Sequence, residues 1–315
     1  MTSPSLHFVA CPDATSGHRM AYWAWGDPAS AHVVLCVHGL SRQGRDFDVL
    51  AASLCAQAAL TPGGVRVICP DVVGRGHSDW LSNPLDYQIP TYAADMLALL
   101  AQLQSDAPIT TLDWVGTSMG GLIGLVVCGQ PGLPMPLATA SPGLESTPLS
   151  VRRLVLNDVG PALEWEAIAR IGSYLGRGGP FDTLTEAAEA LRLISSGFGP
   201  HTVAQWLALS APMVKAGEGG RLHLHYDPAL AVPFNHATQA STAQGEAVLW
   251  QLFDRVQADT LVLRGAESDL LSRATAEAMT QRGPKARVAE FAGVGHAPTL
   301  VAGDQLAAVT SFLLA

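Results

Sequence analysis

Short, continuous apolar runs alternate with helix-length segments along most of the chain. A run of about four to eight apolar residues is typical of a strand buried on both faces of a parallel sheet, and helices lie between such strands. We expect strands at residues 33–40, 66–71, 110–115, 151–156, 260–265 and 287–291. We expect core helices at residues 48–59, 92–103, 119–128, 246–256, 274–279 and 305–314. This alternation predicts an α/β fold with a mostly parallel central sheet flanked by helices, and a site at the carboxyl ends of the strands.

Three segments depart from this alternation. Residues 6–10 and 18–25, joined by a turn-rich stretch, predict an opening hairpin. Residues 130–150 are rich in proline and predict an irregular surface excursion. From residue 161 to residue 235 the pattern is amphipathic and helical, so we expect a helical cap inserted between two strands. The cap helices are expected at 165–175, 184–194 and 203–209.

The expected domain organisation is one core interrupted by this cap. Residues 1–160 form the first part of the core, 161–235 the cap, and 236–315 the second part. The chain has 315 residues, of which 48% are hydrophobic and 14% charged, so it has enough apolar material for one large core.

The charge balance excludes two classes of partner. The 27 acidic residues outnumber the 18 basic ones, which gives a formal net charge of −9, and the basic residues form no run. Such a surface repels polyanions, so we expect neither nucleic acid nor a membrane surface as a partner. We expect a small-molecule substrate and a monomer or a homodimer.

The cysteines and the N-terminus point to the cytoplasm. The five cysteines are odd in number and include no C-x-x-C pair, so we expect neither a disulfide framework nor a metal site. The N-terminal residues have no basic region followed by an apolar one, and no later run approaches the roughly 18 apolar residues of a membrane span.

The first chemical motif is G-x-S-x-G at residues 116–120, in GTSMG. It joins an expected strand to an expected helix, which is the context in which such a serine is a nucleophile. The glycines allow close approach of the neighbouring strand and helix, and the helix N-terminus offers free backbone N–H groups. We therefore identify Ser118 as the candidate nucleophile. The alternative is a glycine-rich turn in which Ser118 merely caps the helix.

A serine nucleophile needs a base and an acid that orients the base. His296 lies in a glycine-flanked loop after the last expected strand, at the same sheet edge as Ser118, and is the candidate base. Asp269 follows a strand by a short loop and is our preferred acid. Glu267, two residues away, and Asp158, at the end of the strand next to that of Ser118, stay as alternatives. If His296 is the base, activity should rise with pH as its imidazole loses a proton.

The oxyanion formed by attack needs preorganised hydrogen-bond donors. The backbone N–H groups of Met119 and Leu40 are the candidates. His38 is expected to brace the loop before Leu40, with a direct contact to substrate as the second interpretation. Arg42 and Arg45 could face the site or pair with acids, and we favour pairing.

Six segments together resemble the α/β-hydrolase superfamily, and within it the small bacterial carboxylesterase-like serine hydrolases that carry a helical cap. They are VHGLSRQGRDF (37–47), CPDVVGRGHSD (69–79), VGTSMGG (115–121), LVLNDVGP (154–161), LVLRGAESDLLS (261–272) and GVGHAPTL (293–300). The resemblance implies the α/β-hydrolase fold and a cofactor-free hydrolase. It also implies that Ser118 is acylated, His296 transfers the proton, Asp269 orients His296, and Leu40 and Met119 form the oxyanion hole.

We expect hydrolysis of a carboxylic ester through an acyl-enzyme. A lactonase or a C–C bond hydrolase would use the same triad, and the fold cannot choose among them. A C–C hydrolase would need a cation for its substrate, for which Arg42 or Arg75 are candidates. A ligand-binding protein on a hydrolase scaffold is the alternative that is not an enzyme.

The substrate pocket is expected between Ser118 and the cap. Besides His38, the candidate contacts are aromatic or apolar cap residues: Trp165, Trp206, Tyr174, Phe181, Phe198 and Met213. Trp165 and Trp206 are the two we select.

Overall fold

The computed structural model describes residues 3–12, 17–60, 63–137 and 148–315. Eight strands form one sheet in the order β1-β2-β4-β3-β5-β6-β9-β10. Their bounds are β1 Ser5–Cys11, β2 His18–Gly26, β3 His32–Val37, β4 Arg66–Asp71, β5 Thr111–Thr117, β6 Val151–Asn157, β9 Asp259–Gly265 and β10 Arg287–Phe291. The expected strands are therefore all present, except that the apolar run at 33–40 leaves the sheet after Val37.

Among the eight strands of this sheet, β2 alone runs against the others. The strands β1 and β2 pair antiparallel, and β2 is antiparallel to β4, whereas all pairs from β4 to β10 are parallel. The chain passes from β3 outward to β4 and then returns to β5 on the other side of β3. Strand order reverses at this point, which is where open α/β sheets hold their ligands.

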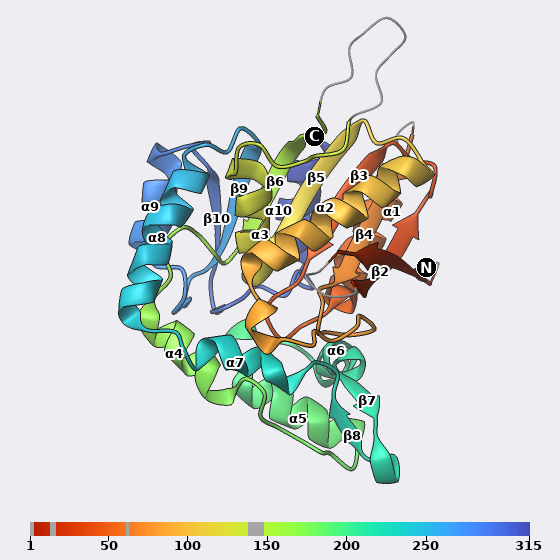
Figure 1. The fold of residues 1–315 in the computed structure, drawn as a ribbon, viewed down its shortest axis with the longest axis vertical. Helices are drawn as coiled ribbons and strands as arrows, with labels where there is room; N and C mark the ends of the chain where they lie inside the picture. The colour runs from red at the N-terminus through yellow and green to blue at the C-terminus, as the bar shows by residue number, and fades with distance from the viewer. Residues whose placement is uncertain (1–2, 13–16, 61–62, 138–147) are drawn as a thin grey trace, which may run out of the picture.

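Helices cover both faces of the sheet. On one face α1 (Asp48–Ala58) contacts α10 (Gly303–Leu314), and on the other α3 (Met119–Gly129) contacts both α2 (Ile89–Asp106) and α8 (Gln239–Phe253). Figure 1 shows α2 and α3 crossing in front of the strands. Two separate clusters of buried apolar side chains fill these layers, which confirms the predicted sandwich of helices on a parallel sheet.

Two core helices begin at least three residues earlier than their apolar patterns indicated. The helix α2 begins at Ile89 with Pro90 in its first turn, a position that proline favours because no backbone N–H is needed there. The helix α8 begins at Gln239, where Thr238 and Ser241 form a capping box. A proline stands in the first turn of α2 and the first turn of α8 is mostly polar, so apolar periodicity reveals neither start. The remaining core helix, α9, spans Arg273–Gln281.

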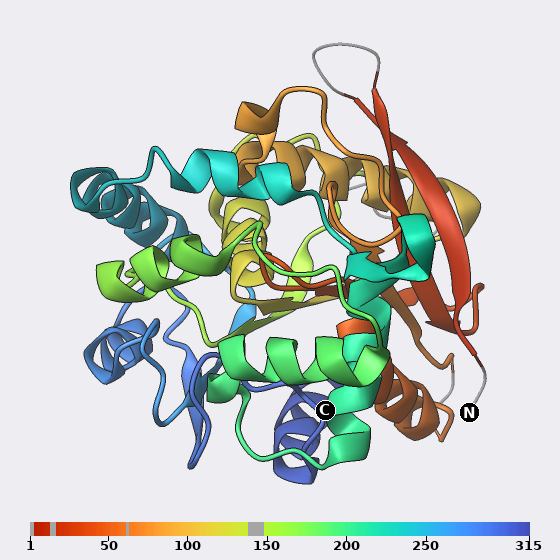
Figure 2. The same cartoon turned by 90° about the horizontal axis from the view of Figure 1, so that it is seen from below.

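The segment between β6 and β9 holds the three expected cap helices: α4 Trp165–Tyr174, α5 Leu184–Ile194 and α6 Val203–Ser210. A fourth short helix, α7, spans Ala231–Phe234, and β7 (Val214–Ala216) pairs with β8 (Leu222–Leu224) in a small antiparallel sheet. These elements lie together below the main sheet in Figure 1, and Figure 2 shows them from below. The division at 161 and 235 stays a prediction.

The proline-rich excursion is described only in part. Residues 130–137 and 148–150 form no helix or strand, and Leu137 bridges to Pro148. Residues 138–147 lie outside the described residues. Within the described ranges, none of the helices has both the length and the apolar character that crossing a bilayer would require.

Candidate active site

Ser118 stands between the end of β5 and the start of α3 in a strained backbone conformation. Its φ is 51° and its ψ is −117°, a region that residues with a side chain rarely adopt. A Cβ at Gly116 would lie 2.4 Å from the backbone of Gly120, and one at Gly120 would lie 1.9 Å from the carbonyl oxygen of Val37. The two flanking glycines are therefore required by close packing, which lets the turn present the Ser118 hydroxyl at the sheet edge.

His296 lies in the loop after β10 and meets Ser118 there. Its Nε2 is 3.0 Å from the Oγ of Ser118. Asn157, the last residue of β6, fixes this edge by donating to the Pro298 carbonyl at 2.8 Å, while its own carbonyl accepts from the Ser118 N–H at 3.0 Å. The structure thus brings the expected nucleophile and base together. Asn157, which holds this edge, was not identified from the sequence.

The acid beside His296 is Asp158. Its Oδ2 lies 2.7 Å from Nδ1 of His296 and accepts a 2.5 Å hydrogen bond from the Ser268 hydroxyl. The other oxygen, Oδ1, accepts from the Gly265 N–H at 2.8 Å. Asp158 has no solvent exposure, so these donors replace water around its carboxylate.

Our preference for Asp269 was therefore wrong. Its side chain is 48% exposed and pairs with Arg170 of α4 at 2.7 Å. In the loop after β9 it is Ser268 that turns toward Asp158, while Glu267 is exposed. The alternative that follows β6, Asp158, is the carboxylate that contacts the base.

The two candidate oxyanion donors border the same cavity as Ser118. Leu40 and Met119 both line it, and a Cβ placed on Gly39 would lie 3.7 Å from that of Ser118. Arg75, which is completely buried, supports both: its Nε donates to the Leu40 carbonyl at 2.8 Å, and its Nη2 lies 3.4 Å from the Met119 sulfur. The role of the two backbone N–H groups stays a proposal.

His38 braces the loop, and both of its ring nitrogens contact backbone groups. Its Nδ1 donates to the Gly39 carbonyl at 2.7 Å, and its Nε2 accepts from the Val72 N–H at 2.9 Å. Burial lowers the pKa of this completely buried imidazole to about 3, and the charges of Arg75 and Arg42 act in the same direction. The structure does not support its selection as a substrate contact, because both ring nitrogens already have backbone partners.

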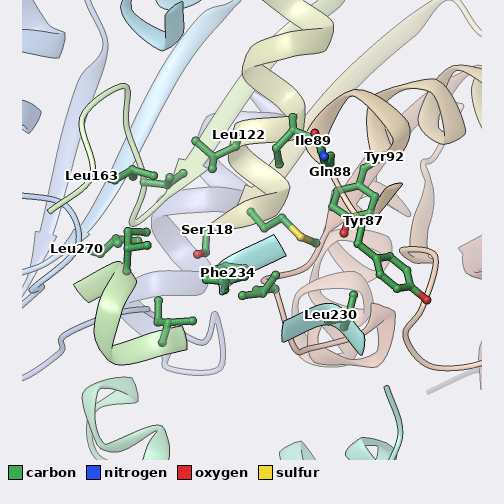
Figure 3. A pocket seen from close by; sticks show the side chains of 15 residues that line it. Tyr87, Gln88, Ile89, Tyr92, Ser118, Leu122, Leu163, Leu230, Phe234 and Leu270 are labelled. Carbon is green, nitrogen blue, oxygen red and sulfur yellow. The ribbon is translucent and has the colours of Figure 1, made fainter. Parts of the chain in front are cut away.

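A largely apolar cavity of about 190 Å³ opens above Ser118, and we call it the apolar arm. Figure 3 shows the Ser118 side chain among those of Leu122, Leu270 and Phe234. Core and cap residues both line this arm: Leu122 from α3, Ile168 and Ile171 from α4, Phe234 from α7, and Tyr87, Tyr92, Leu163 and Leu270. Sequence reasoning selected none of these eight residues.

A second, smaller cavity of about 80 Å³ also reaches Ser118, and we call it the polar arm. His296 and Ala297 line it, and so do Arg170 and Tyr174 from α4. Phe198 lines it as well, so two of the aromatic residues considered from the sequence border this arm. Leu40, Ser118 and Ile171 line both arms, so the arms meet at the nucleophile.

Neither selected tryptophan lines either arm. Trp206 stacks on Phe198 with a centroid distance of 6.0 Å and lies 5.2 Å from the ring of His201. Trp165 is half-buried at the first position of α4. An amphipathic pattern shows that a helix has a buried face but not which neighbour covers it, and this is why the sequence did not reveal that these two residues lie outside both arms.

The arginines considered for the site are held by other groups. Arg42 makes a bidentate ion pair with Asp46, and Arg45 makes one with Asp48, as expected. Burial of Arg75 leaves no open path from its guanidinium to the cavity. Arg42 borders the polar arm but is held by Asp46, so neither Arg42 nor Arg75 is free to pair with a substrate carboxylate as a C–C hydrolase would require.

One group of side chains in the described ranges has metal-ligand composition: Cys11, His18 and Asp95. Nε2 of His18 donates to Oδ2 of Asp95 at 3.0 Å, and none of the three residues lines either arm. The site around Ser118 therefore consists of a hydroxyl, an imidazole and a carboxylate in a chain of hydrogen bonds.

Residues 34–309 match the Alpha/beta hydrolase family, and the chain belongs to this family. It is similar to a 3-hydroxybutyrate-oligomer hydrolase from Cupriavidus necator, with 45% identity over 313 residues that cover 98% of each chain. Among solved structures, an alpha/beta hydrolase from Novosphingobium aromaticivorans is 33% identical with a TM-score of 0.79, over 100% of this chain and 99% of that one. An esterase from Exiguobacterium antarcticum shares the fold at 18% identity, with a TM-score of 0.64 over 98% of this chain and 99% of the other.

Proposed function

We propose that the protein is a carboxylic ester hydrolase whose substrates are short oligomers of 3-hydroxybutyrate. The observation that carries the proposal is the hydrogen-bonded chain from Ser118 through His296 to Asp158, at the floor of a cavity. The similarity to the Cupriavidus necator enzyme, which extends over nearly the whole of both chains, supports this substrate class. Each linkage in such an oligomer is a carboxylic ester.

In the first step Ser118 attacks the ester carbonyl carbon. Its hydroxyl proton passes to Nε2 of His296, which is 3.0 Å away, and the carbonyl oxygen becomes an oxyanion. Asp158 holds Nδ1–H of His296 and stabilises the imidazolium. The N–H groups of Leu40 and Met119 would stabilise the oxyanion, and each such donor is typically worth about 3 kcal/mol of barrier.

The intermediate then collapses. The bond from carbon to the ester oxygen breaks, His296 gives its proton to the departing alkoxide, and the acyl group stays on Ser118. A water molecule repeats the sequence: it gives a proton to His296, attacks the acyl carbon, and releases the acid while Ser118 regains its proton. The atoms and protons of both steps are supplied by the substrate, water and these side chains, so the reaction calls for no cofactor.

The shape of the site suits this substrate class. The apolar arm offers aliphatic and aromatic side chains for methyl and methylene groups, and neutral ester carbonyls are tolerated in such a surface. A formal net charge of −9 is compatible with a small substrate that is not a polyanion.

The test is turnover of purified protein with the dimer and trimer of 3-hydroxybutyrate, and with p-nitrophenyl esters from acetate to long acyl chains. The parent protein should turn over many times, and Ser118→Ala should reduce kcat/KM by at least about 10⁴-fold. Only a hydroxyl is removed, so circular dichroism and melting temperature should be retained. If the protein hydrolyses p-nitrophenyl esters but none of the oligomers, it is an ester hydrolase and the proposed substrate class is rejected. Equal rates in parent and variant would reject both.

A further inference from the structure

The two arms meet at Ser118 but differ in chemistry, and His296 belongs to only one of them. The polar arm is lined by His296, whereas the apolar arm is not. In the mechanism proposed above, Nε2 of His296 must reach the departing oxygen to protonate it. The departing alcohol therefore lies in the polar arm, and the acyl group lies in the apolar arm.

The helix α4 divides the two arms and presents a different face to each. Ile168 lines the apolar arm alone, and Ile171, three residues further on, lines both arms. Arg170 and Tyr174, four residues apart, line the polar arm. Residues three and four apart lie on the same side of a helix, so this single helix gives the polar arm a guanidinium and a phenol that the apolar arm lacks, and Ile171 lies where the two arms meet.

Arg170 is the cation of the polar arm whose ion pair is most easily exchanged. Its Nε and Nη2 both contact one oxygen of Asp269, at 2.8 and 2.7 Å, so the pairing is not the two-oxygen fork that Arg42 makes with Asp46. The side chains of Arg170 and Asp269 are 43% and 48% exposed. Such exposed pairs contribute little, because water competes for both partners. An incoming carboxylate can therefore take the place of Asp269.

The chemistry of the proposed substrate supplies that carboxylate. When the last ester of a 3-hydroxybutyrate oligomer is cleaved, the departing alcohol is a single 3-hydroxybutyrate unit that carries the free carboxylate. The polar arm has less than half the volume of the apolar arm, about 80 against about 190 Å³. The smaller arm suits the single departing unit, and the larger one suits the remaining acyl chain.

We propose that Arg170 binds the terminal carboxylate of the oligomer, so that the enzyme removes 3-hydroxybutyrate units one at a time from the carboxyl end. This inference rests on the proposed function and deepens it. Asp269 competes with the substrate carboxylate for the guanidinium of Arg170. It acts on the substrate through Arg170 and is therefore a positioning residue. Its negative charge holds Arg170 when the arm is empty and repels a carboxylate that enters it.

The test compares the dimer of 3-hydroxybutyrate as the free acid with the same dimer converted to the primary amide at its carboxyl end. Both contain one cleavable ester, and only the first carries the charge. The parent should favour the acid in kcat/KM by about tenfold or more, mainly through a lower KM, because a charge-assisted hydrogen bond is lost with the amide. Arg170→Gln should reduce this ratio to near one, and Arg170→Lys should restore part of it. Asp269→Asn should raise the ratio several-fold.

Arg221→Gln is the matched control. Arg221 is also in the segment between β6 and β9 and also pairs with an aspartate, Asp182, at 2.7 Å, and its side chain is 45% exposed. It lines neither arm, so its replacement should keep the parent ratio. With the trimer blocked at its hydroxyl end, the first products should be free 3-hydroxybutyrate and the blocked dimer.

Three results would overturn the inference. If the parent hydrolyses p-nitrophenyl butyrate but has the same acid-to-amide ratio as Arg170→Gln, the carboxylate subsite is rejected and the ester hydrolase stands. If Arg170→Gln lowers kcat/KM equally for acid and amide, Arg170 has a structural role only. Failure of the parent to hydrolyse any of these esters would reject the proposed function together with the subsite.

Discussion

The carboxylate of Asp158 lies 2.7 Å from Nδ1 of His296, and it reaches this position from the end of β6, the strand beside that of Ser118. Two more groups donate to this carboxylate: the N–H of Gly265, the last residue of β9, and the hydroxyl of Ser268 in the loop that follows. The acid is therefore held from the neighbouring strand by two donors besides the base. A carboxylate fixed in this way keeps the imidazole in the tautomer that can accept a proton from Ser118.

The first prediction separates the two aspartates. Asp158→Asn should reduce kcat for p-nitrophenyl butyrate by about 10³- to 10⁴-fold, because the amide cannot stabilise the imidazolium and favours the wrong tautomer. Asp269→Asn, which removes a half-exposed carboxylate that pairs with Arg170, should change kcat for the same neutral ester far less. Steady-state kinetics on both variants would show which of the two aspartates supports His296. A larger loss in Asp269→Asn than in Asp158→Asn would show that the contact seen here is not the working one.

The second prediction concerns the turn that carries Ser118. In Gly120→Ala the added Cβ would meet the Val37 carbonyl at 1.9 Å, so strand and helix must separate. We expect a loss of at least about 2 kcal/mol in the free energy of unfolding, together with a fall in activity. Urea unfolding measures the first quantity, and ester turnover measures the second.

Gly245 supplies the control for this change. It is also a helical glycine, in α8, but nothing lies within 4 Å of a Cβ at that position. Gly245→Ala should increase the free energy of unfolding by about 0.5–1 kcal/mol, since alanine is the better helix former. Equal effects of the two alanines would contradict the packing argument.

The third prediction is a loss of stability in mild acid that arises from His38. Its pKa is about 3 in the folded protein and 6.5 in its ordinary state, so below pH 6.5 the unfolded chain binds a proton that the folded chain does not. The contribution of His38 is complete above pH 6.5 and is lost progressively as the pH falls toward 3. One such group accounts for a slope of at most about 1.4 kcal/mol per pH unit.

His38→Gln should therefore be less stable than the parent at pH 7.5 but should show a shallower dependence of the free energy of unfolding on pH between 6.5 and 4.5. Its lower stability at pH 7.5 follows from disturbing the bonds to Gly39 and Val72. His7, whose side chain is exposed on β1, is the matched control, and His7→Gln should keep the parent slope. Identical slopes in all three proteins would remove His38 from this account.

The fourth prediction tests the assignment of the acyl group to the apolar arm. Leu163→Trp adds bulk to the wall of that arm, so kcat/KM for p-nitrophenyl octanoate should fall at least about tenfold more than for the acetate. Leu193→Trp is the control, because Leu193 lies in the cap helix α5 and is 70% exposed. A uniform loss across chain lengths in Leu163→Trp would mean that the arm does not hold the acyl chain.

Much of the fold follows from the sequence because buried parallel strands are continuous apolar runs. The strands at 66–71 and 287–291 agree residue for residue with β4 and β10. The nucleophile motif is equally local: GTSMG lies where a strand, a tight turn and a helix meet within a few residues. His296 could be placed beside Ser118 because both follow strands that end at the same edge.

The acid could not be chosen in the same way. Asp158 and Asp269 follow adjacent parallel strands, β6 and β9, so both reach the correct edge of the sheet. What distinguishes them is which residue of the loop after β9 turns inward. Ser268 does so, and Asp269 then meets Arg170, a partner 99 residues away. Side-chain direction within a short loop depends on such distant contacts, and no local pattern encodes it.

The helix α4 gives the specificity of this protein a modular character. Helix α4, Trp165–Tyr174, supplies walls to both arms, whereas the hydroxyl comes from the turn after β5, the imidazole from the loop after β10 and the carboxylate from the residue after β6. The same helix therefore contributes to the preference for the acid half of an ester and to the preference for its alcohol half. Exchange of this one segment between relatives would change both halves of the preferred ester at once and leave the bond-breaking groups untouched.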